Sequence, residues 1–172
     1  MTTPTLDRHP TLASSCARAA TAAEARFRID YPDLSRRDSR VIALDQRTAE
    51  LARRLAADEP RWRGGHFLEY QSTVPAGDDA RLRTTGGAEV LLSQELADAD
   101  VVVMLAAVGA SAEGAAVIGD ACAARYIMSA GLVVPGADGT DDVVSALRPN
   151  AMVLVILQES DDVAEVLSAL RV

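Results

Sequence analysis

Residues 97–134 read ADADVVVMLAAVGASAEGAAVIGDACAARYIMSAGLVV, and the order of residue types in this stretch decides the fold. A near-continuous apolar run over 100–107 is typical of a strand buried on both faces of a parallel sheet. Val108 and Gly109 end that run, Ser111 is a favoured N-cap, and helical spacing continues to about residue 125. A second apolar run over 126–134 completes a β–α–β unit, whose first strand we expect at the centre of the sheet.

The same alternation of strands and helices extends on both sides of this unit. Strands regularly separated by helices require right-handed crossovers and a parallel sheet. The sequence therefore predicts a single α/β domain over 39–172, doubly wound and three-layered, with a mostly parallel, Rossmann-like sheet. The further strands are expected at 40–44, 66–71, 81–85 and 151–157, and the further helices at 48–57, 88–97, 141–147 and 161–170.

Residues 1–38 differ in composition from the rest of the chain. Thr, Ala, Ser and Arg dominate this segment, and Pro4, Pro10 and Pro32 interrupt it. Only residues 13–27 have helical potential there. We expect an N-terminal helical arm that can be removed without unfolding the domain.

Composition and charge exclude several classes of function. The 17 basic residues are all arginine, so no lysine exists for a Walker phosphate loop, a pyridoxal Schiff base or a Ser-Lys pair. A net charge of −8 argues against nucleic acid and anionic membranes as partners. Cys16 and Cys122 lack the spacing of a zinc site. No apolar run approaches the roughly 20 residues of a membrane helix, and no secretory signal is visible, which predicts a cytoplasmic protein.

Ligands of doubly wound folds bind at the carboxyl ends of the strands, where the strand order reverses. Two loops meet that condition, one after the first strand and one after the central strand. The candidate binding residues are Asp45 and Arg47 in the first loop and Gly109, Ala110, Ser111 and Gly114 in the second. In the second loop, backbone amides and the positive end of a helix would face the same space and hold an anion. The alternative is a tight turn in which Ser111 is an ordinary helix cap.

The stretch over 97–134 resembles the tubulin/FtsZ superfamily, in which a buried strand leads into a GGGTGTG phosphate loop and a helix beginning GAA. The matching positions here read VGASAEG, residues 108–114. The likeness continues in the family's order through RVIALDQRTAELARRL, HFLEYQS, ARLRTTGG and DDVVSALRPNAMVLVILQES, and covers roughly residues 40–157. The resemblance implies a sheet with the strand order 3-2-1-4-5-6 and a site for GTP.

The two loops differ from those of the family in charge. Asp45, Gln46 and Arg47 stand where the family has a glycine-rich loop, and Glu113 replaces a small neutral residue. A carboxylate about 5 Å from a phosphate charge costs on the order of 3 kcal/mol at an effective dielectric of about 20, whereas a helix N-terminus returns about 0.3–2 kcal/mol. The family's catalytic acids lie in a second domain, which would begin where this sequence ends at Val172. The resemblance therefore implies a shortened relative that has lost ordinary GTP binding and hydrolysis.

Three functions stay open on the sequence. The first is an FtsZ-like domain without GTPase activity, catalytic residues or a bound cofactor, which serves in assembly, protein interaction or an accessory role through a protein partner or self-association. The second is nucleotide or small-anion binding with weak hydrolase activity at the 109–114 loop, using GTP or another nucleotide with Mg²⁺ on Asp45 or Glu113. The third is an unrelated small enzyme with Asp45 or His66 as acid or base.

Overall fold

The computed structural model describes residues 37–58, 61–62, 64–72, 79–136 and 139–172. All of them belong to the compact unit Ser35–Val172. The predicted arm over 1–38 falls outside the described residues except for Arg37 and Asp38, so its helix and its boundary stay predictions. No helix of the described part of the chain has the length and apolar character needed to cross a membrane.

The central strand is β5 (Val101–Ala106), and all six of its side chains are buried. It pairs in parallel with β1 (Ser39–Ala43) on one side and with β6 (Met128–Val133) on the other. Because side chains alternate across a strand, Val103 and Leu105 enter one core cluster while Val102 and Met104 enter the other. The prediction of a central strand buried on both faces is confirmed.

The sheet has seven strands in the order β4-β3-β2-β1-β5-β6-β7. Its remaining strands are β2 (Gly65–Ser72), β3 (Arg81–Thr84), β4 (Glu89–Leu91) and β7 (Val153–Ile156). The strands β2, β1, β5, β6 and β7 are parallel, whereas β3 runs antiparallel to both of its neighbours. The expected order 3-2-1-4-5-6 is therefore found, with one additional strand at the edge beside β3.

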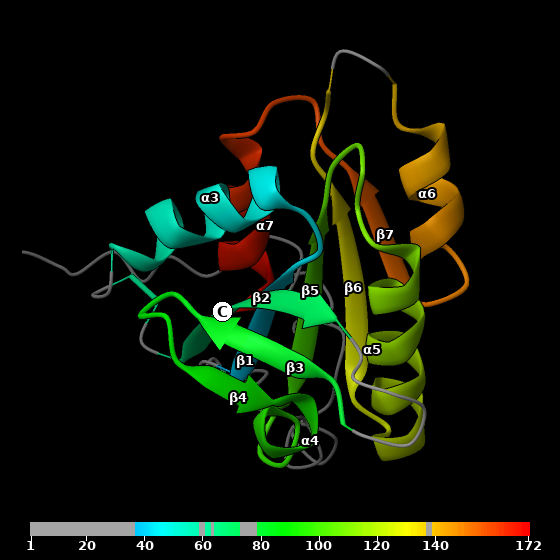
Figure 1. Ribbon diagram of the computed structural model, residues 1–172. Helices are drawn as coiled ribbons and strands as arrows, with labels where there is room; N and C mark the ends of the chain where they lie inside the picture. Colours follow the sequence, from blue (N-terminus) through cyan, green and yellow to red (C-terminus); the bar gives the residue numbers. More distant parts are fainter. Residues whose placement is uncertain (1–36, 59–60, 63, 73–78, 137–138) are drawn as a thin grey trace, which may run out of the picture. The chain divides into compact units, whose positions relative to one another are not determined.

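Helices cover both faces of the sheet and give three layers (Figure 1). On one face α3 (Gln46–Ala56) and α7 (Asp162–Leu170) contribute to the first core cluster. On the other face α4 (Leu92–Glu95), α5 (Ala112–Arg125) and α6 (Asp141–Leu147) contribute to the second. Cys122 of α5 lies in the second cluster, where burial raises the pKa of its thiol to about 11 against an opposing effect of Arg125. The thiol therefore stays protonated at neutral pH and acts as a packing group.

The prediction of a helix over 88–97 is wrong for the first part of that range. Residues of β4 pair with β3 in a hairpin, and only the short α4 follows. The reason is the turn at Gly86 and Gly87: Gly87 has φ +89°, and the N–H of Thr84 donates to the Ala88 carbonyl across the turn at 2.8 Å. Two glycines between β-rich runs are a hairpin signal, which here prevails over the helical spacing.

Replacing Gly119 by Ala should destabilise the domain by about 1–3 kcal/mol. A Cβ at this position of α5 would lie 2.7 Å from the Asn150 Cβ and 2.8 Å from its carbonyl oxygen. The turn at Asn150 cannot move away cheaply, because its amide side chain donates to the Ala146 carbonyl at 2.8 Å. Urea unfolding measures the effect. Gly86→Ala is the control, since its Cβ would meet nothing closer than 3.8 Å, and an equal loss in both variants would contradict the packing account.

Candidate functional site

The strand order reverses between β1 and β5, because the chain leaves β1 toward β2 on one side and leaves β5 toward β6 on the other. The two loops that follow these strands lie against each other at this switch point. The N–H of Ser111, in the second loop, donates to the Leu44 carbonyl at the end of β1 at 3.0 Å. The structure thus brings together the two loops in which the sequence placed its candidate residues.

Asp45 is the N-cap of α3, and its carboxylate accepts from three donors. Its Oδ1 accepts the backbone N–H of Thr48 at 2.9 Å. Its Oδ2 accepts the Thr48 hydroxyl at 2.8 Å and the backbone N–H of Ala107, from the other loop, at 2.7 Å. The carboxylate therefore both caps a helix, as Asp favours, and ties the ends of β1 and β5 together.

The loop over 107–114 uses several of its amides within the protein. Gly109 adopts φ +88°, and the Ala110 N–H donates to the Ala107 carbonyl at 3.0 Å. The Ser111 hydroxyl accepts the Gly114 N–H at 3.0 Å as the N-cap of α5. These contacts match the alternative in which the loop is a tight turn with a serine cap. Binding of an anion at this loop stays a prediction.

Gly114 has a packing reason to be glycine. A Cβ on this residue would lie 2.8 Å from two ring carbons of Tyr70, which projects from β2. Any side chain there would displace the ring from the second core cluster, in which Tyr70 is buried. The match of this glycine to a phosphate loop therefore has a second explanation that needs no ligand.

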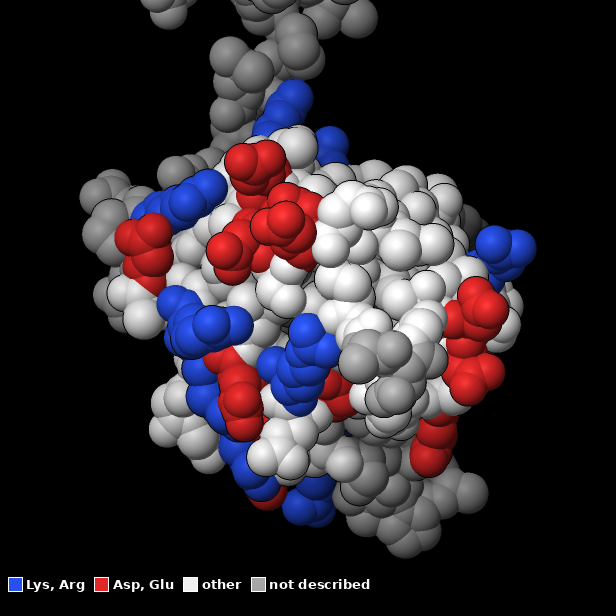
Figure 2. All heavy atoms as spheres, turned by 90° about the horizontal axis from the view of Figure 1, so that it is seen from above, with Lys and Arg blue, Asp and Glu red and all other residues white. Residues whose placement is uncertain are grey.

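Arg47 is the exposed cation of this end of the sheet that the sequence singled out. Its Nη1 lies 3.3 Å from the position of a Cβ on Gly136, so the guanidinium reaches across to the loop after β6. Glu113 is exposed on the first turn of α5. Seen toward this end, acidic and basic side chains of the described residues border an uncharged area (Figure 2).

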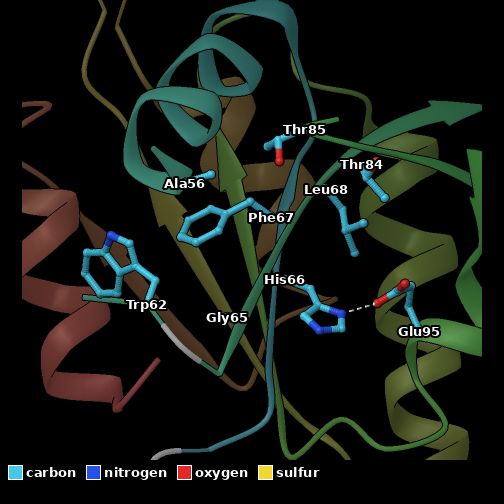
Figure 3. A pocket seen from close by; sticks show the side chains of 9 residues that line it. All are labelled: Ala56, Trp62, Gly65, His66, Phe67, Leu68, Thr84, Thr85 and Glu95. Carbon is cyan, nitrogen blue, oxygen red and sulfur yellow. Dashed lines mark hydrogen bonds and ion pairs between the residues drawn. The ribbon is translucent and has the colours of Figure 1, made fainter. Parts of the chain in front are cut away.

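A hollow of about 440 Å³ lies beside the amino end of β2 (Figure 3). One wall carries His66, whose Nδ1 lies 2.9 Å from Oε2 of Glu95. The same carboxylate oxygen lies 2.9 Å from Nε of Arg40, which also donates to the Glu95 carbonyl at 2.8 Å. The side chains of Arg40 and Glu95 are only 6% and 14% exposed, whereas that of His66 is 57% exposed.

The other wall of this hollow is aromatic. Trp62 and Phe67 meet edge to face with ring centroids 6.2 Å apart. The indole Nε1 of Trp62 is buried without a hydrogen-bond acceptor among the described residues. Sequence reasoning considered His66 as an acid or base but missed Arg40, Glu95 and Trp62. An arginine at the start of an apolar strand was the available signal, because a buried arginine requires a carboxylate partner.

No described group of three or more His, Cys, Asp or Glu side chains is arranged to hold a metal ion. At the switch point, the contacts of Asp45 with Thr48 and Ala107 use both of its carboxylate oxygens. The arrangement is suited to holding the two loops in fixed positions. At the hollow, Oε2 of Glu95 lies 2.9 Å from both Nε of Arg40 and Nδ1 of His66.

Comparisons with known proteins give no family for this chain. No family model matches the chain, and no curated protein matches it. Among solved structures, the chain is similar to a CMP N-glycosidase, BcmB, of Clostridium botulinum, with a TM-score of 0.43 and 14% sequence identity. That similarity covers 76% of this chain and 98% of the other. A likeness this weak transfers no activity, so the fold class rests on the sheet order and the helical layers described above.

Proposed function

We propose that this protein is a non-catalytic assembly or interaction domain with an FtsZ-like topology, in which an internal carboxylate takes the place of a bound anion. The observation that carries the proposal is the 2.7 Å hydrogen bond from the Ala107 N–H to Asp45 Oδ2. In a nucleotide-binding α/β domain, amides at this place donate to phosphate. Here the acceptor is part of the chain.

The Asp45 carboxylate also opposes the binding of a phosphate at this place. A phosphate charge about 5 Å from Asp45 would meet a repulsion on the order of 3 kcal/mol. Release of the carboxylate to make room would break its hydrogen bonds with Thr48 and Ala107, so the bonds from these donors to a phosphate would only replace the ones lost. Neither route favours a nucleotide.

The FtsZ-like part of the proposal is supported by the strand order. The order β3-β2-β1-β5-β6-β7 is the one that the resemblance implies. The main departure from the family is the segment Asp45, Gln46 and Arg47, which replaces a glycine-rich loop and brings the internal carboxylate with it.

The proposal is tested by thermal melting of the full chain with and without 1 mM GTP and Mg²⁺. Binding would stabilise the folded state by RT ln(1 + [L]/Kd), so we expect no shift in Tm with GTP, GDP or inorganic phosphate. We also expect no phosphate release above that of a heat-denatured sample. A saturable increase in Tm would move the function to nucleotide or anion binding.

That second function has one observation in its favour. Arg47 extends its guanidinium toward Gly136 and Val108, where the three loops at the carboxyl ends of the strands converge. Arginine is well suited to phosphate. If GTP with Mg²⁺ does raise Tm, the Arg47→Ala variant should lose most of that increase, whereas Arg54→Ala, an exposed arginine in the last turn of α3, should keep it.

A further inference from the structure

Strand β7 is an apolar edge of the sheet. Among the described residues it pairs only with β6. The stretch AMVLVIL over 151–157 contains no charge, proline or glycine, which are the features that usually protect an edge strand from pairing with another chain. Its apolar side chains reach solvent: Met152 is 77% exposed, Val153 44% and Ile156 50%.

The free hydrogen-bonding groups of this edge follow from the alternation of the strand. The N–H of Leu157 donates to the Val133 carbonyl of β6 at 3.0 Å. Backbone groups of successive residues point to opposite sides of a strand, so those of Val155 point the same way, and those of Leu154 and Ile156 point to the open edge. A partner strand can therefore bind both residues through their N–H and C=O groups.

We infer that β7 pairs antiparallel with β7 of a second copy of this chain, around a two-fold axis at Val155. This inference rests on the proposed assembly function and names its partner. In this register Leu154 of one copy lies opposite Ile156 of the other, and every outward-facing backbone group of Leu154 and Ile156 is used. Opposite residues of an antiparallel pair project to the same face, and Leu154 and Ile156 share a face in each copy because their positions differ by two.

The charges at the two ends of β7 favour this partner and this direction. Arg148, which ends α6, precedes the strand, and the exposed residues Glu159 and Asp161 follow it. In the antiparallel pair, the Arg148 end of one copy lies beside the acidic end of the other. A parallel pair would place like charges together. Self-complementarity of this kind is what a two-fold interface requires.

The test is sedimentation equilibrium of the full chain in 0.15 M salt, where the net charge of each copy is screened. We expect a dimer. Ile156→Lys, which places an ammonium group at a half-exposed position of the edge, should raise the dimer Kd at least tenfold. The matched control is Leu91→Lys, an exposed apolar residue on the opposite edge strand β4, which should leave the dimer unchanged. Melting curves verify that both variants fold.

A charge exchange tests the direction of pairing. Arg148→Glu should weaken the dimer about tenfold, and the combination of Arg148→Glu with Glu159→Arg and Asp161→Arg should restore most of the affinity. Restoration supports the antiparallel arrangement, and an equally weak triple variant overturns it.

Two results would overturn the inference: a monomeric wild type at 100 μM, or a dimer whose Kd is unchanged by Ile156→Lys. If the wild type is monomeric and the amides of Leu154 and Ile156 resist hydrogen exchange, another segment of the chain covers the edge. A monomer that fails to bind GTP removes only the edge pairing and leaves the proposed function in place. A dimer that binds GTP tightly contradicts the proposed function and leaves the edge pairing in place.

Discussion

Replacing Glu95 by Gln is expected to lower the free energy of unfolding by about 3 kcal/mol or more, because it leaves the Arg40 guanidinium charged and buried without its carboxylate. Arg40 is 6% exposed, and its Nε lies 2.9 Å from the Glu95 carboxylate. Removal of one partner of such a pair costs more than the pair itself contributes, since the remaining charge cannot be solvated. Chemical denaturation of the variant measures the loss.

Two controls separate this effect from the rest of the cluster. His66→Gln should cost less than about 1 kcal/mol, because the imidazole is mostly exposed and the glutamine amide can still donate to Glu95. The double variant Arg40→Met with Glu95→Met should be more stable than Glu95→Gln alone, since apolar residues of similar size can replace a buried pair. If the double variant is the least stable of the three, the charge argument is wrong.

Replacing Asp45 by Ala is the second substitution with a large expected effect. We expect it to lower the free energy of unfolding by about 3 kcal/mol. The variant loses a helix cap, which is worth about 0.5–2 kcal/mol, and it leaves the Ala107 N–H without an acceptor, at about 1–3 kcal/mol. The matched control is Asp161→Ala. Asp161 is also the N-cap aspartate of a helix, but its side chain makes no capping hydrogen bond. Asp161→Ala should therefore lower the free energy of unfolding by less than about 1 kcal/mol.

The difference between the two aspartates measures the combined contribution of the Thr48 cap and of the link from Asp45 to Ala107. If Asp45→Ala and Asp161→Ala have the same unfolding midpoint and the same slope against denaturant, the contact with Ala107 makes no measurable contribution to stability in solution.

The sequence predicts the parts of this fold that depend on local pattern. The apolar run of β5 identifies a strand buried on both faces, and the separation of strands by helices leads to the parallel sheet with helices on both sides. The hairpin of β3 and β4 was missed because helical spacing over 88–97 competed with the turn at Gly86 and Gly87. At that turn the glycine conformation decided the structure.

The location of the candidate site was predicted from the sequence, but the contacts within it were not. Sequence spacing located the loops of Asp45 and Ser111 at the switch point, because parallel strands present their carboxyl ends at one edge. The bond between Asp45 and Ala107 joins residues 62 positions apart, and that between Arg40 and Glu95 joins residues 55 apart. Such distant pairings depend on the packed structure, and no local pattern of residues specifies them.

The central claim is that the Asp45 carboxylate occupies the place of an anion at the switch point, and chemical rescue tests it most directly. In the Asp45→Gly variant the helix cap loses little, because glycine is tolerated at an N-cap, while the carboxylate is removed and space is opened. The measurement is Tm against formate concentration, with chloride at equal ionic strength as the reference. We predict a saturable rise of several degrees for Asp45→Gly and none for wild type or Asp161→Gly. Equal responses of all three proteins, or no response of Asp45→Gly to formate, acetate or phosphate, would contradict the claim.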